Sequence, residues 1–344
     1  MMAICPRLLL VLCLAMVVLR SDPAGASAAF ASPTIPKTTI SNGVLEAVIL
    51  LPDSKTGYYR GPRFDWSGLI ARVKYQGHTY FGEWRTPHNP EGNDDVVGPA
   101  EEFGMGGPGT PGPLGYEEAS PGGAFIKIGV GLLEKTAEPG YDYGQNYRIV
   151  RPGEWEIDSG KAWVEFHQEL KDASGWGYSY TKRVSLVSDR PELIVAHTLR
   201  NTGSKPIVTT QYCHNFTIID EDPIGPHYAV RFPFQVKAES GLGKLAEVHA
   251  DTISFPKTLT EGEEVDAELG GFSDAVGDNG AIIENLKTGA GVRIRGSKPI
   301  VRLHIYAVGT AVCPEPFVDL RLCPGEQTQW ENSYTFYQVG APGE

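Results

Sequence analysis

The sequence contains few features of the common cofactor-dependent and metal-dependent enzymes. It has five cysteines in 344 residues, and their spacing matches no zinc-binding motif. It has no phosphate-binding loop of the Walker type, no glycine-rich dinucleotide fingerprint and no serine nucleophile elbow. We therefore expect a protein that uses no cofactor and holds no structural metal.

Charge is also scarce, because only 21% of the residues are charged, and acidic residues outnumber basic ones to give a net charge of −12. Such a chain is a poor partner for nucleic acid or for an anionic membrane surface. The main apolar run, residues 8–19, is too short to span a bilayer. Arg7 precedes this run and small residues follow it, so we expect residues 1–31 to be a signal peptide with a short leader. The protein is then exported, either periplasmic or secreted, with no membrane contact after cleavage.

Three cysteines remain once that segment is removed, namely Cys213, Cys313 and Cys323. An odd number permits one disulfide and one free thiol. Cys313 and Cys323 can pair if they face each other across two strands.

The rest of the chain predicts strands and little helix. Apolar residues alternate or form short blocks between Gly, Pro, Asn and Asp. The predicted strands are 44–51, 69–75, 124–129, 162–170, 178–187, 193–200, 207–219, 228–238, 281–287, 291–295, 300–308, 317–322 and 328–339. There is no repeat, no alternation of strand and helix and no Pro/Ser-rich linker, so residues 32–344 are predicted to be one all-β sandwich domain.

One segment interrupts the regular spacing of strands. Residues 98–123 contain nine Gly and five Pro, which predicts neither helix nor a paired strand. Loops of this length are usually functional or disordered. Glu101, Glu102 and Tyr116 within it suit hydrogen bonding to a sugar and stacking on it, so the segment is either a pocket wall or a surface excursion.

A second unusual segment, residues 57–68, interleaves aromatic and charged side chains. Aromatic faces pack on the C–H faces of sugars, while charged side chains bind the hydroxyl groups. We therefore take Tyr58, Arg63 and Asp65 as candidate substrate-binding residues. The alternative is that Arg63 and Asp65 form a structural ion pair beside a core Trp66.

The main chemical candidates lie in two later segments. His214 stands among apolar residues of a predicted strand, where its protonation can be tuned near neutral pH, and Asn215 follows it directly. Glu315 lies between Pro314 and Pro316, which predicts an edge or rim position rather than a central strand. A His acid and a Glu base on opposite walls of a cleft would form a proton-transfer pair.

Two further histidines are candidate binding residues. His227 follows a Pro-Ile-Gly-Pro turn, and His304 lies on the predicted strand 300–308. Each can reach the pocket of His214, and each can equally be structural.

The order of several short motifs resembles the aldose 1-epimerase (galactose mutarotase) superfamily. The resemblance begins with Asn42-Gly-Val-Leu-Glu-Ala-Val48 and continues through Gly177-Tyr-Ser-Tyr-Thr-Lys182, Leu199-Arg-Asn-Thr-Gly203 and Tyr212-Cys-His-Asn-Phe216. It ends with Cys313-Pro-Glu-Pro-Phe317, Leu322-Cys-Pro-Gly-Glu326 and Tyr334-Thr-Phe336. These motifs span most of the chain after the leader.

The resemblance implies a large antiparallel β-supersandwich and a cofactor-free isomerase acting on a mono- or oligosaccharide. By motif, His214 would be the acid that protonates the ring oxygen, and Glu315 the base that takes the proton of the anomeric hydroxyl. The ring would then open, rotate about its C1–C2 bond and close as the other anomer. We expect a monomer or a weak dimer.

Two other functions stay open on the same fold, because a fold does not fix its chemistry. A polysaccharide lyase acting on uronates would need a cation near the substrate carboxylate, for which Arg60 or Arg63 is available. A non-catalytic carbohydrate-binding protein is favoured if Glu315 points away from His214.

Overall fold

The computed structural model describes residues 34–107, 109–238 and 241–340, and these described residues form one compact unit. The predicted signal peptide lies outside the described residues and stays a prediction. Within the described ranges, no helix combines the length and the apolar character that crossing a membrane requires. The only helical element within these ranges is the 3₁₀ turn η1 (Val276–Asp278).

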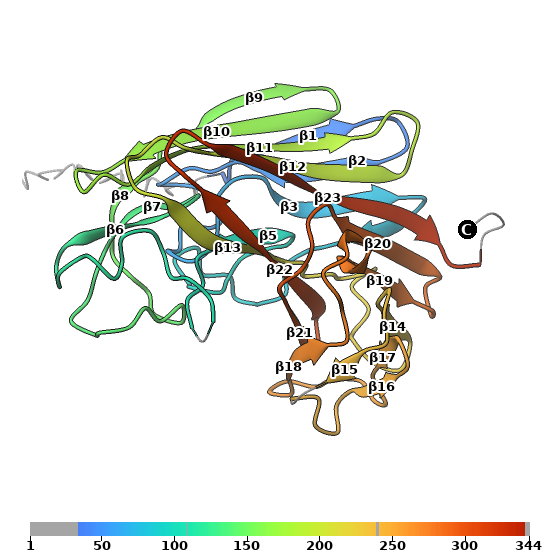
Figure 1. Cartoon of the computed structure of the whole chain (residues 1–344). Coiled ribbons are helices and arrows are strands. Elements are labelled where there is room, and N and C mark those ends of the chain that lie inside the picture. Colours follow the sequence, from blue (N-terminus) through green and yellow to red (C-terminus); the bar gives the residue numbers. More distant parts are fainter. Residues whose placement is uncertain (1–33, 108, 239–240, 341–344) are drawn as a thin grey trace, which may run out of the picture. The chain divides into compact units, whose positions relative to one another are not determined.

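Two antiparallel sheets dominate the fold (Figure 1). The larger has the order β16-β17-β14-β19-β20-β23-β12-β11-β10-β9. Its strands are β9 (Glu156–Gly160), β10 (Trp163–Lys171), β11 (Gly177–Leu186), β12 (Glu192–Asn201), β14 (Tyr228–Arg231), β16 (Glu247–His249), β17 (Thr252–Ser254), β19 (Gly280–Asn285), β20 (Ala290–Gly296) and β23 (Gln327–Gln338).

The second sheet has six strands in the order β15-β18-β21-β22-β13-β5. They are β5 (Ala100–Phe103), β13 (Ile207–His214), β15 (Lys237–Ala238), β18 (Val265–Gly270), β21 (Arg302–Val308) and β22 (Ala311–Leu322). Smaller sheets are formed by β1 (Lys37–Ser41), β2 (Glu46–Leu50), β3 (Leu69–Tyr75) and β4 (His78–Tyr80), and by β6 (Ala124–Lys127), β7 (Gly131–Glu134) and β8 (Ile149–Pro152).

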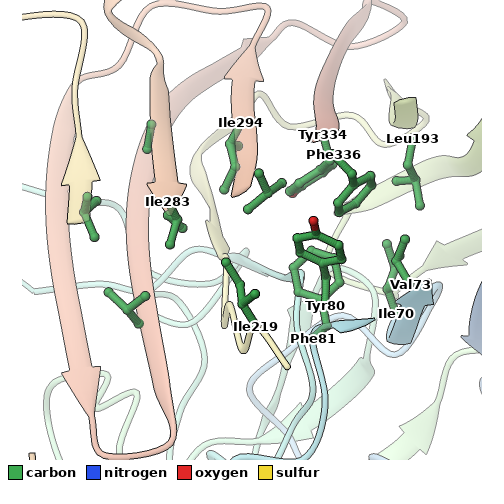
Figure 2. Packing of buried hydrophobic residues seen from close by; sticks show 14 of the residues in the cluster. Ile70, Val73, Tyr80, Phe81, Leu193, Ile219, Ile283, Ile294, Tyr334 and Phe336 are labelled. Atoms are coloured by element: carbon green, nitrogen blue, oxygen red, sulfur yellow. The ribbon is translucent and has the colours of Figure 1, made fainter. Parts of the chain in front are cut away.

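The two large sheets pack face to face because their strands alternate apolar and polar residues. Val318, Leu320 and Leu322 of β22 share one buried cluster with Tyr180 of β11 and Trp330 of β23. A second cluster joins the larger sheet to β1–β4. In Figure 2, Tyr334 and Phe336 of β23 lie against Tyr80 and Phe81, and the ring centroids of Tyr80 and Phe336 are 4.7 Å apart.

The all-β prediction and the antiparallel supersandwich are confirmed. The predicted strand 193–200 is observed as β12, paired with β11 and β23 along its length. The predicted strands 207–219 and 228–238 are too long, since β13 ends at His214 and β14 at Arg231.

The prediction that residues 98–123 hold no paired strand is wrong for β5. Ala100–Phe103 contains neither Gly nor Pro and pairs with β13, Glu102 being opposite Tyr212. The glycines and prolines flank this short strand instead of interrupting it. Tyr116, from the same segment, is fully buried in a second aromatic cluster and is no surface excursion.

The expected rim position of Glu315 is also wrong, because β22 runs through both flanking prolines and is central in its sheet. Its pairing with β13 is recorded only from Leu322 to Phe317, whereas its pairing with β21 continues to Ala311. The carbonyl of Pro314 accepts a hydrogen bond from the Asn215 side chain at 2.9 Å. The missing proline N–H groups therefore face the side where the β13 ladder has already ended.

The disulfide considered between Cys313 and Cys323 is excluded by this strand. Cys313 lies inside β22 and Cys323 just beyond its end, and a strand rises by about 3.3 Å per residue. Bridged cysteines need Cα atoms within about 7 Å. All three described cysteines are free thiols, of which only Cys323 is exposed.

Candidate active site

A cavity of about 360 Å³ opens on the face of the six-stranded sheet that points away from the larger sheet. This volume lies at the lower end of the range for small-molecule pockets, roughly 300–1,000 Å³. The sheet contributes side chains from β13, β18, β21 and β22. Loop residues such as Arg63, Trp84 and Asp94 complete the wall.

Alternation along the strands brings a row of acidic and histidine side chains to this face. In the pairing register, Glu268 of β18 is opposite His304 of β21, and His304 is opposite Glu315 of β22. His214, at the end of β13, contacts Glu315 from the other side. Adjacent strands thus present Glu268, His304, Glu315 and His214 side by side.

His214 and Glu315 are in direct contact. Nδ1 of His214 lies 3.0 Å from Oε1 of Glu315, and only 6% of His214 and 5% of Glu315 is exposed. The two groups are close enough to attract but are not aligned as a hydrogen bond, since Nδ1 has no hydrogen-bonding partner. The expectation that they occupy opposite walls is therefore wrong, because neighbouring strands carry them on the same wall.

The pKa of Glu315 is lowered. Burial by itself raises the pKa of this carboxyl, but the positive charges of His214, His304 and Arg63 outweigh burial. Glu315 is therefore ionised at neutral pH and able to accept a proton. It is a candidate general base held beside a candidate general acid.

His304 has acidic partners on both of its ring nitrogens. Nδ1 lies 3.2 Å from Glu268 and Nε2 lies 3.2 Å from Asp266. Burial lowers the pKa of His304, but the hydrogen bond to Glu268 and the nearby carboxylates, Glu315 among them, raise it above its usual value. This histidine is a positively charged neighbour of Glu315.

Arg63 closes the other side of the row. Its Nε donates to Glu102 at 2.7 Å, one Nη donates to Asp94, and the other donates to the Tyr212 hydroxyl at 2.9 Å. That same Nη lies 3.4 Å from Nε2 of His214. A guanidinium can only donate, so Arg63 offers Nε2 no acceptor for a proton, and the proton that His214 can transfer is the one on Nδ1, the nitrogen that faces Glu315.

The structure brings together four of the predicted site residues, His214, Glu315, Arg63 and His304, all of which line the cavity. Glu102 does not line the cavity, but one of its carboxylate oxygens accepts the hydrogen bond from Arg63. Lys127 donates to the other oxygen of Glu102 at 2.8 Å. Burial opposes ionisation, but Lys127 and Arg63 lower the pKa of Glu102 to about 2. This glutamate is an ionised support for the site.

The other five predicted residues lie elsewhere. Glu101 and Asp65 are sealed behind the sheet and share the ammonium of Lys182. The Tyr58 ring is buried and stacked on His88. Asn215 is buried and binds Pro314 and Tyr334, while His227 is exposed outside the cavity. The binding roles expected for Asp65, Tyr58, Glu101, Asn215 and His227 are not supported by these positions.

Several cavity residues were missed from the sequence. Arg302 and Tyr306 share the cavity face of β21 with His304, so the period of two along a predicted strand was a usable signal. Asp266 and Glu268 alternate with apolar residues on β18, a strand that was not predicted. Trp84, Arg85 and Asp94 come from loops and gave no signal.

One cluster of three side chains, two of which line the cavity, has metal-ligand chemistry. Ligand atoms of His214, Cys313 and Glu315 all lie within 4.8 Å of one another. Imidazole, thiolate and carboxylate together suit Zn²⁺ or a similar transition metal. Two of these residues, His214 and Glu315, are the candidate acid–base pair, so metal binding would compete with proton transfer.

The fold is similar to that of solved carbohydrate-related proteins. A galactose mutarotase-like protein from Clostridium acetobutylicum matches with a TM-score of 0.55 and 13% identity, over 88% of this chain and 95% of the other. A galactose mutarotase related enzyme from Lactobacillus acidophilus matches with a TM-score of 0.51 and 14% identity, over 90% and 99%. No protein-family model and no curated protein sequence matches the chain. The chain therefore has the galactose mutarotase-like fold, which confirms the resemblance at the level of fold.

Proposed function

We propose that the protein is an aldose 1-epimerase-like isomerase that interconverts the anomers of a sugar, with His214 as the acid and Glu315 as the base. The observation that carries this proposal is the contact between an ionised, buried carboxylate and a histidine at one end of a sugar-sized cavity. We also propose that the protein is exported, on the strength of the apolar run at residues 8–19.

The close contact of the pair suits this reaction. The anomeric hydroxyl and the ring oxygen are bonded to the same carbon, so their acid and base need not stand on opposite sides of the sugar. Each group needs only hydrogen-bond reach, about 2.6–3.2 Å, to its own oxygen. A sugar that places C1 over the His214–Glu315 contact can meet both groups from one side.

The proton transfers follow from the charges. Glu315 takes the proton of the C1 hydroxyl while the acid gives its proton to the ring oxygen, and the bond between C1 and that oxygen breaks to give the open aldehyde. Rotation about C1–C2 and return of both protons close the ring as the other anomer. Neither step needs a redox change. Arg63, held by Glu102, keeps the imidazole of His214 in place.

A lyase acting on uronates is less well supported. It needs a free cation for the substrate carboxylate, but Arg63 is paired with Glu102 and Asp94, and Arg302 with Glu268. Arg85 lines the cavity without an ion pair to any described residue, but Glu264 lines the same wall and would repel a carboxylate there. Arg60, the other candidate, is paired with Glu91 and does not line the cavity. A sugar carboxylate would also meet Asp266 and Glu264 in the cavity wall.

The proposal is tested by proton exchange NMR between the α and β anomers of several aldoses. Each proton transfer is expected to contribute about 10²–10⁴ in rate. We expect His214→Ala to lose acceleration by that factor and His227→Ala, the exposed histidine outside the cavity, to retain it. No acceleration of any sugar by the wild type would overturn the proposal and leave a binding protein or another glycan enzyme.

A further inference from the structure

A second hollow adjoins the cavity and shares part of its wall. It has a volume of about 770 Å³ and is lined by the segment 259–264 and by the turn 308–310 between β21 and β22. Trp84, Arg85 and Glu264 line both spaces. The two hollows are therefore neighbours, and together they offer more room than a single sugar requires.

The second hollow lies at a defined separation from the reacting pair. Along β22 the chain passes from Glu315 through Cys313 and Ala311, which are buried with Trp84 and Phe216, to the turn at Thr310, which borders the second hollow. At about 3.3 Å per residue, the five steps from Glu315 to Thr310 cover about 16 Å. This separation exceeds one pyranose ring, so a ligand that reaches from Glu315 to the second hollow must contain more than one sugar residue.

The junction between the two spaces is built from Trp84 and Arg85. Phe216 stacks on the Trp84 ring at 4.6 Å, and the Arg85 guanidinium lies over the ring at 4.3 Å. Trp84 is held in place at its side chain and its backbone. The indole Nε1 donates to the Val96 carbonyl at 2.7 Å, and the backbone carbonyl of Trp84 accepts from the Thr310 hydroxyl at 2.8 Å. The ring is buried, with Phe216 and the guanidinium on it, so the junction presents the donors of Arg85 to the hydroxyls of a sugar.

Arg85 is available for such contacts. Among residues 34–107, 109–238 and 241–340, no ion pair is recorded for its exposed side chain. Arg63 and Arg302, in contrast, are each neutralised by carboxylates. The guanidinium donors of Arg85 can therefore turn toward a ligand without breaking an ion pair.

The charge of the second hollow limits what can occupy it. Its wall carries Glu83, Glu261, Glu263 and Glu264 against the single arginine Arg85. Lys257 pairs with Glu263 and offsets only one of these four charges. Uronate, phosphate or sulfate groups would be repelled, so the surface favours uncharged sugars.

We propose that the substrate is the reducing end of an uncharged oligosaccharide, whose following sugar residues cross Trp84 and Arg85 and lie in the second hollow. This inference rests on the proposed function, because it takes C1 of the first sugar to be at His214 and Glu315. It deepens that function by naming the substrate as a glycan chain end rather than a free hexose.

The test compares kcat/KM for anomer exchange of glucose, maltose and maltotriose, with the corresponding β-1,4 series and an oligouronate as further substrates. We expect at least a tenfold higher kcat/KM for the better trisaccharide than for glucose, with the oligouronate the poorest. Equal values for mono- and trisaccharides, or a preference for the oligouronate, would overturn the inference while leaving the proposed function intact.

A variant locates the effect in the second hollow. Glu261 is exposed and lines only that hollow, so Glu261→Trp places a large side chain in it. We expect the trisaccharide-to-glucose ratio of kcat/KM to fall at least fivefold. Glu247→Trp, on the exposed strand β16, is the matched control and should leave the ratio unchanged. An unchanged ratio in Glu261→Trp would contradict the inference.

If no sugar is turned over at all, the proposed function fails. A binding measurement then still tests whether an oligosaccharide occupies the second hollow. Saturation-transfer NMR with maltotriose and the β-1,4 trisaccharide would then show contact to the second and third sugars in the wild type and its loss in Glu261→Trp. The absence of such contact would overturn the inference by itself.

Discussion

Two consecutive glutamates of strand β5 send their carboxylates to opposite faces of the six-stranded sheet, and they end in two different kinds of charged cluster. Glu101 faces the larger sheet, where Lys182 and His197 bind it beside Asp65. Glu102 faces the cavity side, where Arg63, Lys127 and Tyr212 bind it. Both carboxylates are fully buried.

The difference lies in what each cluster leaves available. The cluster around Glu101 is sealed between sheets and has no opening to a cavity. The cluster around Glu102 holds Arg63, which lines the cavity and approaches His214. We propose that the charges behind the sheet stabilise the fold, whereas those in front position the groups to which we assign the reaction.

The largest effect is expected from breaking the sealed cluster. Glu101→Gln removes the main partner of the buried Lys182 ammonium, and loss of one partner of a buried ion pair typically costs about 3–5 kcal/mol. Urea denaturation should show this loss in the free energy of unfolding. Glu247→Gln, at an exposed ion pair, is the matched control and should lose less than about 1 kcal/mol. Equal losses in the two variants would remove the distinction.

Acid should act on the cavity-side cluster through Glu102. Its pKa is about 2 in the folded protein, against about 4.3 for an unperturbed glutamate. A lowered carboxyl pKa adds stability above the unfolded value and loses it as the pH falls through the folded value, here by about 3 kcal/mol between roughly pH 5 and pH 2. Carbon NMR titration of the Glu102 carboxyl checks the pKa directly. A midpoint above pH 4 would contradict the expected pairing.

A divalent metal such as Zn²⁺ should distinguish the two clusters, because it should lower the activity of the cavity residues and leave the sealed cluster around Glu101 unaffected. Zn²⁺ can bind His214, Cys313 and Glu315, so it should slow anomer exchange at least tenfold, and a chelator should restore the rate. Cys313→Ala removes one ligand and should raise the Zn²⁺ concentration needed for inhibition. Inhibition that does not depend on Cys313 would argue against this set of ligands.

The smallest effect is expected at the surface. Cys323 is exposed and free, so Cys323→Ser should change the free energy of unfolding by less than about 0.5 kcal/mol. The same change should remove the fast reaction of the folded protein with a thiol reagent. Cys213 and Cys313 are buried, and burial raises the pKa of both thiols, so they should react only on unfolding. Rapid labelling of Cys313 would show that this buried thiol becomes exposed to solvent in the folded protein.

The sequence carried much of the fold, because period-two alternation is local. The strand predicted over residues 193–200 was observed with its boundaries extended by one residue at each end, while β18 was overlooked although Val265, Ala267 and Leu269 alternate with polar positions. The central place of β22 was not predictable from its prolines. Their missing N–H groups are harmless only because β13 stops pairing there, which is a property of the partner strand.

The site was predictable in part. His214 and Glu315 followed from motifs, and the structure adds that they touch. The separation of Glu101 from Glu102 follows from strand alternation, but it needed the knowledge that residues 100–103 form a strand. Trp84 and Arg85 reach the cavity through tertiary packing of loops, which no local pattern encodes.

The central claim is that the contact in the cavity does chemistry while the charges behind the sheet maintain the fold. One paired measurement tests it most directly, namely anomer exchange by NMR together with the free energy of unfolding, both on Glu315→Gln. The account predicts that exchange falls by about 10²–10⁴, while most of the stability is retained, because the amide fills the same space and His214 can become neutral. Retention of exchange in a folded Glu315→Gln protein would contradict it.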